Sequence, residues 1–209
     1  QIVWIKQPKA QIAISAVAHP FKAYSAVKYN GQGSYVIAGA ILAMFFIASL
    51  IKKVGSGFLY TDISVRNYNV FVTLAQTVGL IFLWSVVNWL MCTLFQGKGS
   101  FKDVFVSSCY ALTPLTVYTF IRVILSYILP LSGKGLLDGI YAVVLLYTFY
   151  LLSIAMITVH EFTFSKFLLS TVVTVLCMIL TVFIIFMIII LLQQFWNFIY
   201  SVIVEAVYR

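Results

Sequence analysis

The sequence is poor in charged residues, and poorest in acidic ones. Only 5 of its 209 residues are Asp or Glu and 13 are Lys or Arg, so 9% of the chain is charged, against about 25% in soluble domains. So few charges cannot cover the surface of a soluble fold of this length. Hydrophobic residues make up 63% of the chain, so most of its surface must face lipid. This composition excludes a soluble enzyme domain, a disordered tail and a disulfide-rich secreted scaffold.

The sequence also lacks the motifs of catalytic and metal sites. Its three cysteines lie inside apolar runs without a Cys-x-x-Cys spacing, so neither a zinc site nor a redox pair is expected. His160 begins a zinc-protease motif, but Phe164 stands where the second histidine is needed. Gly97-Lys98-Gly99 does not continue as a phosphate loop and is expected to form a flexible turn. We therefore predict no enzyme activity, no cofactor and no metal.

Long apolar runs are what the sequence does contain. Five of them are long enough to cross the hydrocarbon core of a bilayer, which needs about 20 helical residues. These five runs cover residues 35–51, 70–95, 106–129, 139–159 and 167–192. The sequence thus predicts an all-α, polytopic membrane protein with one integral membrane domain. Its expected parts are an N-terminal segment at 1–33, a five-helix bundle at 34–192 and a C-terminal helical tail at 193–209.

The basic residues predict how this bundle is oriented. The net charge of +8 is spread in ones and twos between the apolar runs, a pattern typical of membrane proteins that face an anionic leaflet and not of nucleic-acid binding. Seven lysines fall on one side of the membrane: Lys6, Lys9, Lys22, Lys28, Lys98, Lys102 and Lys166. Five basic residues fall on the other: Lys52, Lys53, Arg66, Lys134 and Arg209. This bias predicts a cytoplasmic N-terminus and a C-terminus outside.

A short helix is expected before the first span. Pro20 is tolerated in the first turn of a helix, and apolar residues recur every three positions from Phe21 to Val27. Lys22 and Lys28 fall on another face, which predicts an interfacial helix whose lysines contact lipid phosphates. An ordinary helix packed under the bundle fits the same pattern.

A few polar residues lie inside the predicted spans. Arg122 is about 10 Å below the outer end of the third span at the helical rise. Its guanidinium either snorkels to the interface or is buried and pairs with a carboxylate, Asp138 first and Glu205 second. Gln76 and Asn88 in the second span are predicted to hydrogen-bond across helices.

Two short strings in the middle of the chain carry a family resemblance. Residues 97–103 read GKGSFKD and residues 110–114 read YALTP. With the helix at Pro20, the five-span plan and the turn at His160, they resemble the Yip family, named for eukaryotic Ypt/Rab-interacting proteins and also found in bacteria. The resemblance covers about residues 13–192. It implies a five-helix membrane domain with a cytoplasmic N-terminus, and no cofactor or catalytic residue.

Five residues of these strings are interpreted as structural marks: Gly97, Gly99, Ser100, Tyr110 and Pro114. Among them, Ser100 is expected to cap the third helix, with Asp103 near its positive end. Pro114 removes a backbone hydrogen bond, so it should bend the third span near Thr113.

The resemblance also directs the functional expectations. The chain lacks the long polar N-terminal region that eukaryotic members use on the Rab side of their activity, so a bacterial member in the plasma (inner) membrane is expected. The first interpretation is a non-enzymatic accessory or scaffold subunit of a larger membrane assembly, such as a transporter. The second is a transporter or channel component with a path among spans two to four, and the third is a lipid-binding membrane organiser. The expected partners are membrane lipids and other integral membrane subunits, and no nucleic acid.

Overall fold

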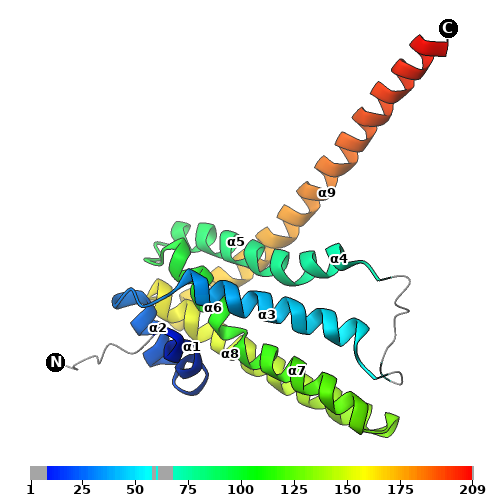
Figure 1. Cartoon of the computed structure of the whole chain (residues 1–209). Coiled ribbons are helices and arrows are strands. Elements are labelled where there is room, and N and C mark those ends of the chain that lie inside the picture. The colour runs from blue at the N-terminus through cyan, green and yellow to red at the C-terminus, as the bar shows by residue number, and fades with distance from the viewer. Residues whose placement is uncertain (1–8, 58–59, 61–67, 209) are drawn as a thin grey trace.

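The computed structural model describes residues 9–57, 60 and 68–208, and the described chain is helical without a strand (Figure 1). Lys6, Arg66 and Arg209, which entered the charge count, lie outside the described residues. The helices are α1 (Lys9–Ala18), α2 (Pro20–Tyr29), α3 (Tyr35–Val54), α4 (Val70–Leu74), the π-helical turn η3 (Ala75–Gly79), α5 (Leu80–Leu94), α6 (Phe101–Ala111), α7 (Thr113–Ile128), the 3-10 turn η4 (Leu131–Gly133), α8 (Lys134–His160) and α9 (Phe164–Tyr208).

Five helical stretches are long and apolar enough to cross a membrane, as the apolar runs predict. They cover Tyr35–Val54, Val70–Leu94, Phe101–Ile128, Leu131–His160 and Phe164–Val207. The first and the last three are longer than the runs from which they were predicted. Polar residues at the ends of the runs do not interrupt these helices, and the fifth continues through the whole predicted tail to Val207. The expected all-α membrane architecture is therefore confirmed by length and composition.

The third span begins at Phe101 and not at residue 106, because its first turn is closed by a capping box. The Oγ atom of Ser100 accepts from the backbone N–H of Asp103 at 3.3 Å, and the Asp103 carboxylate accepts from the backbone N–H of Ser100 at 3.4 Å. These bonds satisfy two of the free donors of the helix start. The break expected from Pro114 lies at Leu112, between α6 and α7.

Two helices, and not one, precede the first span. α1 was missed, and its Ile12, Ala13 and Ala16 are buried. α2 begins at Pro20 as predicted, but it packs against α6 and α8 with Tyr24 and Val27 fully buried. Because that apolar face points into the protein, the structure favours the helix packed under the bundle over one that lies on lipid.

α9 departs most from the predicted outline. No break separates the fifth span from the tail, because the helix continues through Gln193 and Gln194 to Tyr208. Its first half packs against α5, where the Cys177 and Met91 sulfur atoms are 3.4 Å apart. Its second half leaves the bundle, and Figure 1 shows it projecting far beyond the other helices.

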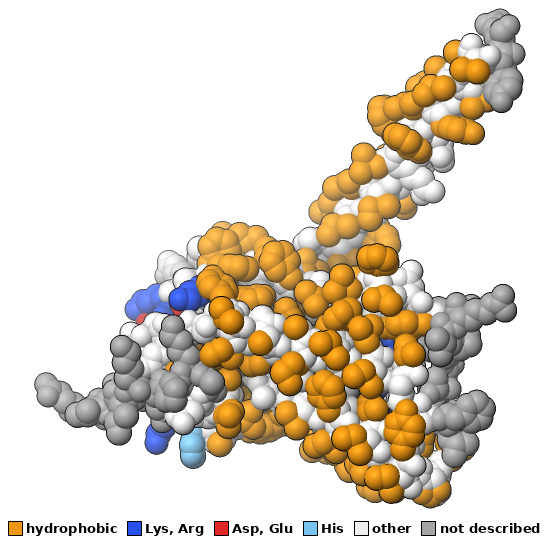
Figure 2. Space-filling model, in the orientation of Figure 1, with side chains coloured by type: hydrophobic (Ala, Val, Ile, Leu, Met, Phe, Trp, Pro, Cys, Tyr) orange, Lys and Arg blue, Asp and Glu red, His pale blue; other side chains and the backbone are white. Residues whose placement is uncertain are grey.

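The bundle has two polar ends. At one end α2 meets the turns after α5 and α8, and we call this the α2 end. At the other end, the η4 end, the chain after α3 contacts the end of α7, since the backbone N–H of Gly57 donates to Ser126 Oγ at 2.9 Å. Figure 2 shows basic side chains gathered at the α2 end and an apolar surface over the remainder of the visible bundle. Polar contacts are therefore sought at these two ends.

The capping box gives a direct test of why the third span starts where it does. Ser100→Ala should lower the free energy of unfolding by about 1 kcal/mol, because an N-terminal acceptor is lost. Thermal and denaturant unfolding in detergent micelles would measure it. Ser201→Ala is the matched control, since its exposed hydroxyl donates to the Phe198 carbonyl one turn earlier in α9. Equal stability of both variants would contradict the proposed role of the cap.

Candidate functional site

At the α2 end, the turn after α5 meets the turn after α8. Both turns reverse through a left-handed residue, Gln96 at φ 63° and Glu161 at φ 58°. The backbone N–H of Lys98 donates to the His160 carbonyl at 3.4 Å, and the Lys98 ammonium pairs with the Glu161 carboxylate at 2.8 Å. The two turns therefore hold each other by a backbone bond and an ion pair.

The imidazole of His160 fills the space between these turns. Its side chain is 2% exposed, and it stacks on Phe162 with ring centroids 5.3 Å apart. A Cβ atom at Gly97 would lie 2.6 Å from His160 Nδ1, and one at Gly99 would lie 2.6 Å from a Val159 methyl group. The glycines are thus required for close approach to α8, whereas the left-handed turn position belongs to Gln96. The two glycines of the expected turn therefore also have a packing role, which the sequence did not predict.

Lys22 and Lys28 of α2 were both predicted to contact lipid phosphates, but only one of them is placed to do so. Lys28 donates its ammonium hydrogen bond to the Val159 carbonyl in the last turn of α8, where cations are favoured by the helix dipole. Burial is the main cause of a lowered pKa of Lys28. Lys22 is exposed. Of the two predicted lipid contacts, Lys22 alone keeps an exposed side chain, and Lys28 serves the end of α8.

Glu161 is the acidic centre of the α2 end. Its carboxylate accepts from the Tyr29 hydroxyl at 2.8 Å and pairs with Lys98. The hydrogen bond from Lys98, and after it the one from Tyr29, lower the pKa of Glu161. The carboxylate thus links α2 with the turn after α5.

Tyr110 connects the same region to the first span. Its ring is fully buried, and its hydroxyl accepts from the backbone N–H of Ser34 at 3.4 Å. Ser34 immediately precedes α3. The two sequence strings therefore place their polar atoms where α3, α6 and α8 come together, while Pro114 marks the start of α7.

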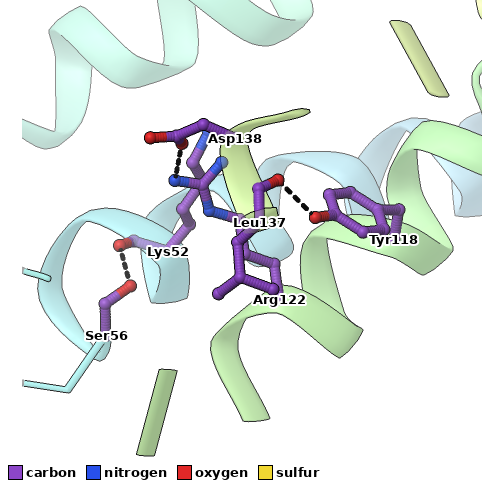
Figure 3. A network of polar contacts seen from close by, with 6 residues as sticks. All are labelled: Lys52, Ser56, Tyr118, Arg122, Leu137 and Asp138. Atoms are coloured by element: carbon purple, nitrogen blue, oxygen red, sulfur yellow. Dashed lines mark hydrogen bonds and ion pairs between the residues drawn. The ribbon is translucent and has the colours of Figure 1, made fainter. Parts of the chain in front are cut away.

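The second cluster lies toward the η4 end and contains the predicted intramembrane arginine. The Arg122 guanidinium pairs with Asp138 at 2.5 Å, and Figure 3 shows this bond between α7 and α8. The Arg122 side chain is 14% exposed and that of Asp138 52% exposed. Arg122 is thus mostly covered by protein, and its partner is Asp138 and not Glu205.

Lys52 of α3 completes this cluster. Its ammonium lies 4.2 Å from the centre of the Tyr141 ring, and the Arg122 guanidinium carbon lies 5.6 Å from the same centre. Two cations therefore lie close to one aromatic ring, and Arg122 alone is paired with a carboxylate, which leaves a positive charge among the described residues of the cluster. Tyr118, one turn before Arg122, donates its hydroxyl to the Leu137 carbonyl at 2.6 Å (Figure 3).

The two predicted amides have different surroundings. Gln76 lies in η3, and its carbonyl accepts from the Lys53 ammonium at 2.8 Å, so it bonds to another helix as predicted. Lys53 also donates to the Thr73 hydroxyl at 3.1 Å. Asn88 is buried, and its carbonyl accepts from the Cys92 thiol at 3.7 Å, one turn further along α5. The described bond of Asn88 is therefore within its own helix.

Most of the chain, including both polar clusters, matches a known protein family. The family model of the Yip1 domain matches residues 14–188. The chain belongs to the Yip1 family. The match begins within α1 and ends within α9, so both polar clusters lie inside the Yip1 domain, and the far half of α9 continues beyond it. The resemblance drawn from residues 97–103 and 110–114 is thereby confirmed.

The other two comparisons add no relative. No curated protein and no solved structure matches the chain at a significant level. Across the described residues of the Yip1 domain, no group of three or more His, Cys, Asp or Glu side chains could hold a metal ion. What the two clusters do chemically is to tie helices together and to present cations.

The residues that sequence reasoning missed are Lys52, Lys53 and Tyr141. The two lysines were interpreted as charges that mark the end of the first span, which they also are. Their adjacency to η3 and α8 depends on how the helices pack. The sequence did contain an indication of this role. Two consecutive lysines end the shortest apolar run, so one of them can easily reach a buried partner on a neighbouring helix.

Replacement of Gly99 tests the contact between the turns. Gly99→Ala should lower the free energy of unfolding by about 1–3 kcal/mol, because the added methyl group overlaps Val159 and His160. Gly139→Ala is the matched control: a Cβ there meets nothing within 4 Å, so stability should be unchanged or rise by up to about 1 kcal/mol. Unfolding in micelles would measure both. A Gly99→Ala protein as stable as the control would refute the close approach.

A double-mutant cycle tests the ion pair between Arg122 of the third span and Asp138 of the fourth. Arg122→Met, Asp138→Asn and the double variant should give a coupling free energy of about 1 kcal/mol, because Arg122 is shielded while Asp138 is half exposed. The matched cycle uses Lys98→Met and Glu161→Gln, whose ion pair includes a 72% exposed lysine side chain and should couple more weakly. A stronger coupling at the α2 end would contradict this ranking.

Proposed function

We propose that this Yip1-family membrane protein is a non-enzymatic scaffold that binds a larger assembly of integral membrane proteins, such as a transporter, through α9. The observation that carries the proposal is the size and exposure of that helix. Its apolar stretch Phe164–Val207 contains 44 residues and has none of its most apolar window buried. A surface of this kind requires a cover that the described chain does not supply.

The length of α9 exceeds what a bilayer covers. At 1.5 Å per residue the 44 residues span about 66 Å, whereas the hydrocarbon core is about 30 Å thick. Even a tilt of about 40°, at the upper end of what transmembrane helices show, leaves roughly 50 Å along the membrane normal. Part of the apolar helix must therefore be covered by something other than lipid tails.

The composition of the tail favours a protein as that cover. Gln193, Asn197, Ser201 and Glu205 recur every four residues, so they form one narrow polar stripe on the helix. Large apolar side chains occupy the other faces and are exposed: Phe195, Trp196, Phe198, Tyr200, Val202, Ile203 and Val207. Burial of each such side chain is worth about 1.5–3 kcal/mol. Burial of this surface by a partner helix would therefore contribute far more binding free energy than a typical surface contact does.

A solute path is less well supported. The cavity beside η3 is lined by Gln76, but not by Asn88, Tyr147 or Arg122, the other polar residues that such a path among spans two to four would use. The Tyr147 hydroxyl instead donates to the Val17 carbonyl at 2.5 Å, which ties α8 to α1. The lining of that cavity is almost wholly apolar, which does not suit a polar solute.

We also propose that the protein lies in the plasma membrane with its α2 end in the cytoplasm. Among the described residues, six lysines are at the α2 end: Lys9, Lys22, Lys28, Lys98, Lys102 and Lys166. Three lysines are at the η4 end: Lys52, Lys53 and Lys134. The positive-inside rule supports this orientation.

Photo-crosslinking in the native membrane tests the scaffold. A photoreactive residue is placed at each position from 185 to 199, one at a time, and the products are separated by mass. If one face of α9 lies against a partner, a product of constant mass should rise and fall with a period of 3–4 residues. The partner should also co-purify in a fixed ratio.

Val143 and Leu146, exposed positions of α8, are the matched controls and should give lipid adducts only. Crosslinking that is uniform along α9, or that joins only two copies of this chain, would count against the scaffold. So would substrate-driven flux in liposomes that contain the purified protein alone.

A further inference from the structure

The Yip1 domain encloses a cavity that neither polar cluster accounts for. It has a volume of about 580 Å³ and lies among α3, η3, α5, α7, α8 and α9, within the usual size range of small-molecule sites. The hydroxyls in its lining are already bonded: Thr77 donates to the Thr73 carbonyl at 2.8 Å, and Thr148 donates to the Val144 carbonyl at 2.9 Å. The walls therefore suit an apolar ligand.

The cavity opens toward the hydrocarbon and not toward water. Among its lining residues, Leu80 of α5, Phe149 of α8 and Ile179 of α9 are themselves exposed on the outer surface of the bundle. These three helices cross the membrane by length and composition, so the opening faces lipid tails. The ligand class that reaches such an opening is a hydrocarbon chain.

One part of the cavity is polar and lies beside a cation. Gln76 lines the cavity and accepts from the Lys53 ammonium at 2.8 Å. Among the described residues, no carboxylate lies within ion-pair distance of Lys53. Asp138 is paired with Arg122, so the described residues of this part of the η4 end carry excess positive charge. An anion beside Lys53 would neutralise it.

The helix beside the cavity is locally widened. The backbone N–H of Leu80 donates to the Ala75 carbonyl five residues earlier, which makes η3 a π-helical turn. Gln76 and Thr77, both in this turn, line the cavity. Such turns are costly and recur at functional sites. The irregular turn therefore coincides with the point where the cavity meets the cation.

We propose that this cavity binds one acyl chain of an anionic phospholipid, whose phosphate lies against Lys53. The apolar walls take the chain, the lateral opening admits it from the bilayer, and the cation selects the headgroup. This site lies apart from the far half of α9, so the proposal does not rest on the proposed scaffold function.

Native mass spectrometry of the full chain tests the site. The protein is exposed in detergent to an equal mixture of phosphatidylglycerol and phosphatidylcholine with identical acyl chains. The unmodified protein should retain phosphatidylglycerol about fivefold over phosphatidylcholine, as expected for one lysine near a lipid phosphate. Equal retention of the two lipids would overturn the proposal, because it would mean that the cavity is filled by any lipid tail.

Two pairs of variants distinguish the contribution of the lipid headgroup to binding from that of the acyl chain. Lys53→Gln should abolish the preference while one lipid is still retained, whereas Lys134→Gln, the same charge change at the start of α8, should keep it. Leu145→Trp fills the cavity and should lose the lipid, whereas Leu146→Trp, on the exposed face of α8, should not. If Leu145→Trp fails to fold, Thr148→Met fills the same cavity.

Retention of the lipid by both filled variants, or loss of the preference in Lys134→Gln, would refute the site. Glycerol phosphate tests whether a free anion suffices. It should not displace the lipid, since it has no chain to place in the cavity, and displacement would show an anion site in place of a lipid site.

Discussion

In hydrocarbon a polar group without a partner is costly, and this constraint organises the whole molecule. Several threonine hydroxyls within the spans bond to their own helix: Thr116, Thr119 and Thr148 each donate to the carbonyl four residues earlier. Most polar contacts between helices lie toward the α2 end or toward the η4 end. Between the ends, the helices meet through apolar side chains, so the two ends determine how the bundle is aligned.

The two ends solve this problem differently. At the α2 end, Glu161 is matched by Lys98 and Tyr29, and Lys28 is occupied by a carbonyl of α8. These charged groups hold α2, the turn after α5 and the end of α8 together. At the η4 end, by contrast, the cations Lys52, Lys53 and Arg122 outnumber the single carboxylate that the described residues bring among them. Glu161 is therefore paired within the protein, whereas Lys53 has no carboxylate partner among the described residues and is suited to an anion from outside.

The features that sequence could predict were those with local causes. Apolar length predicted the spans, Ser100 predicted a cap and Pro114 predicted a break, because each acts through its own neighbours. The pairing of Arg122 with Asp138 could be anticipated because few carboxylates exist. The spacing role of Gly99 could not, since it depends on where α8 lies. α1 was missed because its small residues give a weak helical pattern. The cavity was missed because it is formed by six elements that pack together only in the folded chain.

The unbroken course of α9 has a mechanical consequence. Val175, Ile179 and Val182 form one wall of the cavity, and the same helix continues without interruption into the tail that follows Gln193. A helix without a hinge transmits a tilt along its length. Ile179 in this wall and Tyr208 at the far end of α9 are about 44 Å apart at the helical rise of 1.5 Å per residue, so a tilt imposed at the far end also changes the gap between α9 and α8.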